Sequence, residues 1–278
     1  MVLAIMVAAL VHARPARADD DGEAAATGRS DKTRLWHGLA VVAGGALYLN
    51  TELVFKDAIS PDGCRWCGPL WFDARLRRSL AWDDGAAADS ASNSTAFIAA
   101  PLVATGGLIL ATIDHPSLRR WYDDVVPVLQ AGVGAALLNQ LVKVIVARER
   151  PYVHYGTTSV QPENDSYTSF FSGHTTLAFA LATSAGTVAT LRDYKLAPAL
   201  WAIGGGLAIA TAYLRIGADA HYATDVIAGA LIGSAIGVAV PLLLHGDVLR
   251  HRTEAVPRID AAPVGPAGSV GFSLGGSF

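Results

Sequence analysis

The sequence predicts an all-α fold, a polytopic bundle of five or six transmembrane helices with one further helix at the membrane interface. Hydrophobic residues make up 52% of the 278 residues and charged residues only 16%, whereas soluble domains carry about 25% charged residues. The mean hydropathy of +0.36 agrees with this imbalance. Five apolar runs have the roughly 17–25 residues that a bilayer core requires: about 95–113, 124–147, 175–191, 197–214 and 225–244.

The composition also excludes some partners and sites. The formal net charge of −3 provides no basic excess, so the expected partner is the lipid bilayer and not a nucleic acid. Cys64 and Cys67 are too few for a disulfide framework or a zinc site with four thiolates.

The N-terminal residues resemble a targeting segment. Residues 2–11 are apolar but too short to cross a bilayer. Ala16-Arg17-Ala18 precedes three aspartates and is typical of a cleavage site, which makes residues 1–18 a possible signal peptide. The alternative is a disordered head or a misplaced start, because the arginines follow the apolar run. Residues 19–34 are polar and predicted to be disordered.

Residues 35–94 form a first apolar segment followed by a charged loop. The run 35–54 is long enough to span a membrane but contains polar side chains, which leaves the count at five or six. Cys64-Arg-Trp-Cys67 is interpreted as a possible short structural disulfide on an oxidising face, or as an inert thiol pair. The segment Trp71–Trp82 alternates apolar and arginine positions and predicts the interfacial helix.

The short loops predict an orientation. Arginine and lysine occur in the loops 114–123 and 192–196 and in the tail after residue 244, and such loops favour the cytoplasmic side. The loops 148–174 and 215–224 then face the periplasm or the exterior, on the outer side of a bacterial-type inner membrane. Residues 95–244 are the predicted transmembrane core, and 245–278 a flexible tail with a hint of a short strand.

Three polar clusters lie where apolar runs meet the loops on this outer side. In the first, Lys143 and Arg150 are seven residues apart, which places them on the same side of a helix that Pro151 ends. An ammonium and a guanidinium that converge form an anion site, because both favour phosphate. The alternative is the ordinary snorkelling of long cationic side chains at a helix end.

The second cluster is Ser172-Gly173-His174, directly before the run 175–191. Serine is a good helix N-cap, glycine admits a ligand close to the backbone, and free amides at a helix start bind anions. His174 could protonate a leaving oxygen beside them. The alternative is a capped helix with an interfacial histidine.

The third cluster is Arg215, His221 and Asp225. A histidine and an aspartate four residues apart share a helix face, so the carboxylate can accept a hydrogen bond from one imidazole nitrogen. The other nitrogen is then free to act as a nucleophile.

A metal site is also possible by residue type, because His174, His221 and Asp225 could all serve as ligands. The neighbouring cations would repel a divalent ion and suit a phosphate or a vanadate instead. We therefore expect no metal and no other cofactor.

The order and spacing of the three clusters resemble the type 2 phosphatidic acid phosphatase and vanadium haloperoxidase superfamily, in its membrane lipid phosphatase branch. The pattern is Lys, six residues, Arg-Pro; Ser-Gly-His; and Arg, five residues, His, three residues, Asp, within about 95–244. Phe171 stands where that family usually has proline, and Leu214 where it usually has serine. Phe171 is expected to loosen the turn before Ser172, and Leu214 to remove a hydroxyl near the phosphate.

The resemblance implies a metal-independent phosphatase of lipid metabolism that acts on a lipid phosphate or pyrophosphate, such as phosphatidic acid or a polyprenyl pyrophosphate. It implies that His221 forms a phosphohistidine, that Asp225 orients it, and that His174 acts as acid and then as base. The alternatives are a vanadate-dependent haloperoxidase and a catalytically inactive phosphate-binding membrane protein or transporter. The groups implied to bind the phosphoryl oxygens are Lys143, Arg150, Arg215, the Ser172 hydroxyl and the Gly173 amide.

Overall fold

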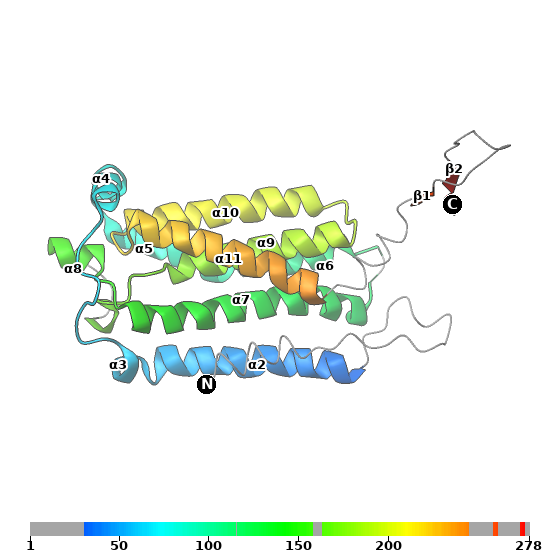
Figure 1. Cartoon of the computed structure of the whole chain (residues 1–278), viewed down its shortest axis with the longest axis horizontal. Coiled ribbons are helices and arrows are strands. Elements are labelled where there is room, and N and C mark those ends of the chain that lie inside the picture. The colour runs from blue at the N-terminus through cyan, green and yellow to red at the C-terminus, as the bar shows by residue number, and fades with distance from the viewer. Residues whose placement is uncertain (1–30, 115, 158–162, 245–257, 261–272, 276–278) are drawn as a thin grey trace, which may run out of the picture.

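The computed structural model describes residues 31–114, 116–157, 163–244, 258–260 and 273–275. Its long helices lie side by side in an elongated bundle (Figure 1), which confirms the predicted all-α membrane fold. Four of the described helices are long and apolar enough to cross a membrane: Gly85–Ala111, Leu118–Val146, Ala197–Gly217 and Ala223–Leu244.

The elements follow one another with short connections. In chain order they are α2 (Asp31–Leu53), α3 (Lys56–Ile59), α4 (Trp71–Leu80), α5 (Gly85–Ser94), the π-helical turns η1 (Thr95–Ala99) and η2 (Leu102–Gly106), α6 (Gly107–Ala111), α7 (Leu118–Val146), α8 (Pro151–Tyr155), the 3-10 turn η3 (Glu163–Asp165), α9 (Gly173–Leu191), α10 (Ala197–Gly217) and α11 (Ala223–Leu244). Two short strands, β1 (Arg258–Asp260) and β2 (Ser273–Gly275), pair antiparallel in the tail.

Helix α9 is the centre of the bundle and packs against α7, α10 and α11. Its buried hydroxyls bond to carbonyls one turn earlier, as Thr187 Oγ1 does to Thr183 O at 2.7 Å. Such a helix needs less apolar surface because other helices cover it. Helix α9 is therefore not among the four candidate spans, although 175–191 was predicted to be one. Helix α2 is not among them either.

Small residues let α11 approach the backbone of α9. A Cβ at Gly233 would lie 2.4 Å from the Thr176 carbonyl oxygen, and one at Gly237 would lie 2.5 Å from the Ala180 carbonyl oxygen. Gly229, Gly233 and Gly237 are spaced by four residues and share one face of α11, where small residues permit such close packing.

Replacing Gly233 with alanine is expected to destabilise the bundle by about 1–3 kcal/mol, because the added methyl group forces α11 away from α9. The measurement is thermal unfolding of the purified protein in detergent. Gly205→Ala is the matched control, since a Cβ there meets nothing within 4 Å. Equal midpoints for the two variants would contradict this packing account.

The two ends of the bundle differ in character. At one end, Arg192 bonds to Asp124 at 2.8 Å and Arg34 pairs with Asp123 at 2.9 Å. The basic loops 114–123 and 192–196 therefore lie together, opposite the end that carries α3, α4 and α8 (Figure 1). The membrane side that each end faces stays a prediction.

Some boundaries differ from those expected. The run predicted as 95–113 belongs to a helix that begins at Gly85, where the Asp84 side chain accepts a hydrogen bond from Ala87 N at 3.0 Å. Residues 55–94 therefore hold three helices instead of a loop with a single interfacial helix. Residues 31–34, expected in the disordered head, form the first turn of α2. The possible signal peptide 1–18 lies outside the described ranges, as does most of the tail.

Candidate active site

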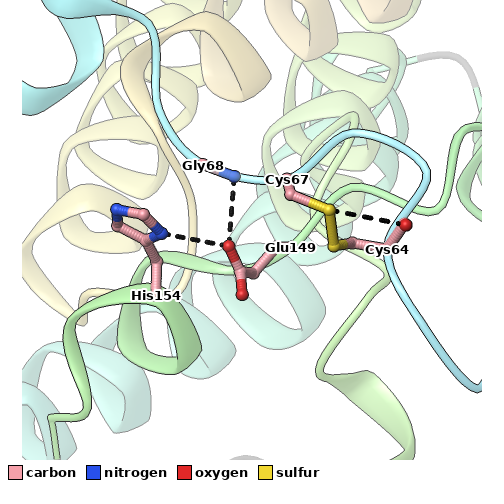
Figure 2. Close-up of a disulfide and its surroundings, with 5 residues drawn as sticks. All are labelled: Cys64, Cys67, Gly68, Glu149 and His154. Atoms are coloured by element: carbon pink, nitrogen blue, oxygen red, sulfur yellow. Dashed lines mark hydrogen bonds and ion pairs between the residues drawn. A yellow bond between two sulfur atoms is a disulfide. The ribbon is translucent and has the colours of Figure 1, made fainter.

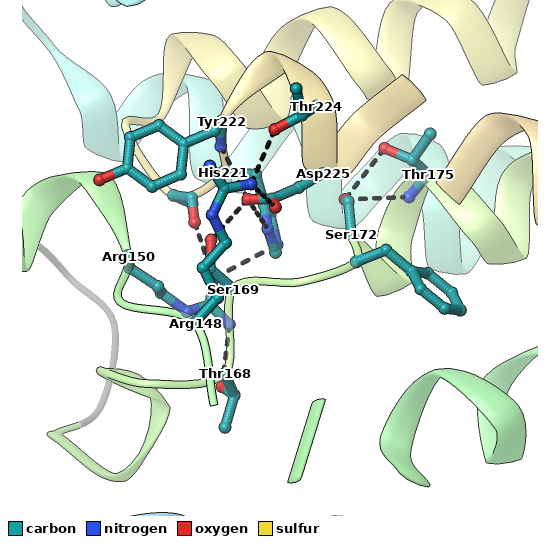
Figure 3. A network of polar contacts seen from close by, with 12 residues as sticks. Arg148, Arg150, Thr168, Ser169, Ser172, Thr175, His221, Tyr222, Thr224 and Asp225 are labelled. Carbon is teal, nitrogen blue, oxygen red and sulfur yellow. Dashed lines mark hydrogen bonds and ion pairs between the residues drawn. The ribbon is translucent and has the colours of Figure 1, made fainter. Parts of the chain in front are cut away.

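The three clusters meet at the end of the bundle that carries α3, α4 and α8 (Figure 1). Figure 3 shows one or two residues of each cluster: Arg150, Ser172, and His221 with Asp225. Lys143 is in the last turn of α7, Arg215 in that of α10, and Gly173 opens α9. The charges of Arg150, Arg215 and Lys143 all act on the His221 imidazole, as does His174. The structure thus brings together side chains that are up to 82 residues apart in the sequence (225 − 143 = 82).

Lys143 and Arg150 are brought together by a turn and not by a shared helix face. Helix α7 ends at Val146, and Ala147 adopts a left-handed conformation (φ 48°, ψ 53°). Arg150 is extended (φ −78°, ψ 154°), as expected for a residue before a proline. The expectation of two turns of one helix is therefore wrong, because the helix stops before it reaches Arg150.

Arg150 determines which ring nitrogen of His221, the candidate nucleophile, carries the proton. Its buried guanidinium donates to the carbonyl oxygens of Asp165 at 2.8 Å and Ala220 at 3.1 Å, and its Nη1 lies 3.3 Å from His221 Nε2. Because a guanidinium has no acceptor, Nε2 must accept, and the proton of the neutral ring is on Nδ1. The nitrogen with the free electron pair is the one that faces the cations.

Asp225 lies on the other side of the ring. Its Oδ2 is 3.7 Å from His221 Nδ1, and it accepts hydrogen bonds from Ser169 Oγ at 2.6 Å and Tyr222 N at 2.9 Å. His221 precedes α11, so the pair does not share a helix face as predicted. Instead the Asp225 side chain folds back to the Tyr222 amide, as in a capping box. This places Oδ2 beside the imidazole, at 3.7 Å from Nδ1, where it makes an electrostatic contact and no hydrogen bond.

Burial lowers the pKa of His221 well below its ordinary value, and the charges of Arg150 and Arg215 lower it further. The imidazole is therefore neutral at neutral pH, the form that a nucleophile requires.

We expect the His221 imidazole of the free protein to titrate with a midpoint below the ordinary histidine pKa of about 6.5. The pKa is lowered because burial and the neighbouring cations both disfavour the charged imidazolium. The measurement is an NMR titration of protein with isotope-labelled histidine, with the His221 signal assigned by its loss in His221→Gln. A midpoint at or above about 6.5 would contradict this electrostatic description.

Helix α5 completes the site. Arg215 Nη1 donates to Asp89 Oδ1 at 2.5 Å and to Ser92 Oγ at 3.0 Å, and His174 Nε2 lies 2.6 Å from Asn93 Oδ1. The sequence did not indicate these residues, because 85–94 was predicted to belong to a loop. Their spacing by three and four residues, one face of a helix, is the signal that could have found them. Ser92 supplies Arg215 with a hydroxyl that Leu214 cannot.

The start of α9 is tightly built. Ser172 caps the helix, and its Oγ accepts a hydrogen bond from Thr175 Oγ1 at 3.0 Å. A Cβ at Gly173 would lie 2.7 Å from Asn139 Oδ1, so only glycine fits. Phe171 is buried and its carbonyl oxygen accepts from Asn139 Nδ2 at 2.6 Å. The turn that Phe171 was expected to loosen is thus held by α7.

Lys143 is available to a ligand. Its ammonium makes no hydrogen bond or ion pair with any residue that the structure describes, and the side chain is partly exposed. Nearby, burial alone would raise the pKa of Asp165, but the charges of Arg150, Lys143 and Lys56 outweigh it and lower that pKa. Lys56 Nζ lies 2.9 Å from Asp165 Oδ1 and ties α3 to the site.

Cys64 and Cys67 are joined by a disulfide, with their Cα atoms 5.4 Å apart (Figure 2). The loop that carries them covers the end of α7: Arg65 N donates to Ala147 O at 2.9 Å, and Glu149 N donates to Trp66 O at 3.0 Å. Among the described residues, no three His, Cys, Asp or Glu side chains are grouped as metal ligands.

The helical membrane bundle thus carries a cationic site around a buried, neutral histidine. Residues 125–247 match the family model of the PAP2 superfamily. A solved structure, the first transmembrane PAP2 type phosphatidylglycerolphosphate phosphatase from Bacillus subtilis, is 18% identical, with a TM-score of 0.44. The match covers 78% of this chain and 96% of that one. No curated protein matches the chain.

Proposed function

We propose that the protein is a membrane-embedded, metal-independent phosphatase that hydrolyses a lipid phosphate or pyrophosphate through a phosphohistidine at His221. The observation that carries this proposal is the arrangement of His221 between Arg150 and Asp225. A buried neutral imidazole faces the cations with its unprotonated nitrogen, and those cations supply the positive charge that phosphoryl transfer requires.

In the first step, the electron pair of His221 Nε2 forms a bond to phosphorus while the bond to the leaving oxygen breaks. His174 donates a proton to that oxygen from its imidazolium form. Burial and the cations lower the pKa of His174 in the free protein, and the negative charge of the bound phosphate opposes them and favours the imidazolium. The Nδ1 proton stays on the ring, which becomes cationic and is stabilised by the Asp225 carboxylate. Stabilisation of the phosphoryl oxygens falls to the side chains of Lys143, Arg150 and Arg215, the hydroxyl of Ser172 and the amide of Gly173.

In the second step, a water molecule attacks phosphorus and the bond between phosphorus and Nε2 breaks. His174, which lost its proton in the first step, accepts one from the water. Inorganic phosphate leaves, and both histidines return to their initial protonation states.

A lipid substrate is favoured by the position of the site. His221 and Arg215 are almost fully buried, whereas Lys143, Gly173 and His174 are partly exposed. A lipid headgroup can therefore approach the site from the side of Lys143, Gly173 and His174, while the acyl chains of the lipid stay in the bilayer. In this proposal the site faces the periplasmic side of an inner membrane, as the basic loops at the opposite end suggest.

The proposal is tested by phosphate release from phosphatidic acid and from a polyprenyl pyrophosphate with purified protein in proteoliposomes containing EDTA. We expect release that EDTA does not reduce. Activity that requires added Mg²⁺ would contradict the mechanism. Halide oxidation with vanadate and peroxide, without phosphate release, would instead identify a haloperoxidase. Phosphate binding without turnover would identify an inactive relative.

A further inference from the structure

Arg148 is a fully buried arginine that the proposed reaction does not use. Its Nη1 bonds to Asp225 Oδ1 at 2.5 Å and its Nη2 bonds to Asp73 Oδ2 at 2.6 Å. The guanidinium lies 3.8 Å from the Trp66 ring centroid and 4.3 Å from that of Tyr222. Both faces and both outer nitrogens are thus occupied by the protein.

This environment excludes Arg148 from binding phosphate. A phosphate would have to displace a carboxylate or an aromatic ring, and the side chain has no exposed surface. A buried arginine kept between two carboxylates instead fixes their positions, since removing one partner would leave an uncompensated buried charge.

We propose that Arg148 is a positioning residue that holds the Asp225 carboxylate against His221, and that Asp73 and Trp66 hold Arg148. Arg148 fixes Oδ1 of Asp225, which leaves Oδ2 directed at His221 Nδ1. This inference rests on the proposed function, because the orientation of His221 matters only if Nε2 attacks phosphorus.

The charges of Arg148 and its two carboxylate partners also favour the phosphorylated intermediate. Asp73, Asp225 and Arg148 together carry one net negative charge beside a neutral His221. When Nε2 is phosphorylated, the ring retains its Nδ1 proton and becomes cationic, so the Asp225 carboxylate then lies beside a cationic ring in place of a neutral one. The net negative charge therefore stabilises the cationic ring of the intermediate more than the neutral ring of the resting enzyme.

The supports of Arg148 come from outside the PAP2 region. Asp73 is in α4 and also accepts hydrogen bonds from Thr224 N at 2.9 Å and Thr224 Oγ1 at 2.8 Å. Trp66 is in the loop closed by the disulfide. Residues 55–94 therefore complete a site whose reactive groups all lie within 125–247.

The test compares Arg148→Lys and Asp73→Asn with the wild type in kcat, KM and competitive inhibition by inorganic phosphate. Both variants are expected to lose about 10–100-fold in kcat, as supporting residues around reactive groups do. KM and the inhibition constant should stay within about twofold, because neither residue contacts phosphate. Arg192→Lys is the matched control, since it alters an arginine–aspartate pair at the far end of the bundle.

Unchanged kcat in both variants, or a parallel rise of the inhibition constant, would overturn the inference. Asp73→Asn keeps the shape of the buried side chain and provides the test if Arg148→Lys does not fold. A wild-type protein without phosphatase activity would refute the proposed function instead, so the two failures are distinguishable.

Discussion

Replacing His221 with alanine is expected to lower kcat by about 10³-fold or more, the scale seen when a nucleophile is removed from a catalytic unit. The reason is that the variant lacks His221 Nε2, the unprotonated nitrogen that lies 3.3 Å from Arg150 Nη1. KM should change much less, because Arg150, Arg215 and Lys143 remain. The measurement is phosphate release from phosphatidic acid in proteoliposomes.

His37→Gln is the matched control for this variant. His37 lies in α2, on the far half of the bundle, and contacts Gln130. It should retain wild-type activity, and both variants should have wild-type helical content by circular dichroism. Full activity of His221→Ala would exclude His221 as the nucleophile.

Replacing His174 with asparagine is expected to separate the two chemical steps. An activated aryl phosphate needs no proton on its leaving oxygen, so the first step should proceed. The second step should slow by about 10²–10⁴-fold, the usual contribution of a general base. Rapid-mixing kinetics with 4-nitrophenyl phosphate should therefore show a burst of one nitrophenolate per protein, followed by slow turnover.

Lipid phosphates have poor leaving groups and should show no burst in this variant, because the first step then also needs His174. A His174→Asn protein that loses activity equally on both substrates, without a burst, would argue against a dual role as acid and base.

The sequence predicted the fold class well because the signals are local. Apolar runs of membrane-spanning length indicate transmembrane helices. The glycines of α11 indicate a face that packs closely against another helix. The structure brings the three predicted clusters together around His221, and the roles given to their residues stay predictions. Two of the geometric reasons were nevertheless wrong. Neither Lys143 with Arg150 nor His221 with Asp225 shares a helix face, since a helix ends or begins between them.

The residues that the sequence did not indicate form ion pairs with partners that are distant in the sequence. Asp89 meets Arg215 126 positions away, and Asp73 meets Arg148 75 positions away. Asp89 stands in a run rich in alanine and serine, and Asp73 in an amphipathic helix rich in arginine, where an aspartate looks like an ordinary surface residue. Only the packing of α4 and α5 against α10 and α11 shows that both are buried ion-pair partners.

The most direct test of the central claim is to identify the phosphorylated residue. His174→Asn protein is mixed with 4-nitrophenyl phosphate, quenched in alkali to preserve a phosphoramidate, digested and analysed by mass spectrometry. Phosphate on His221, and its absence in the His221→Ala/His174→Asn double variant, is the predicted result. Phosphate on another residue, or none during a measured burst, would contradict the claim that His221 forms the covalent intermediate.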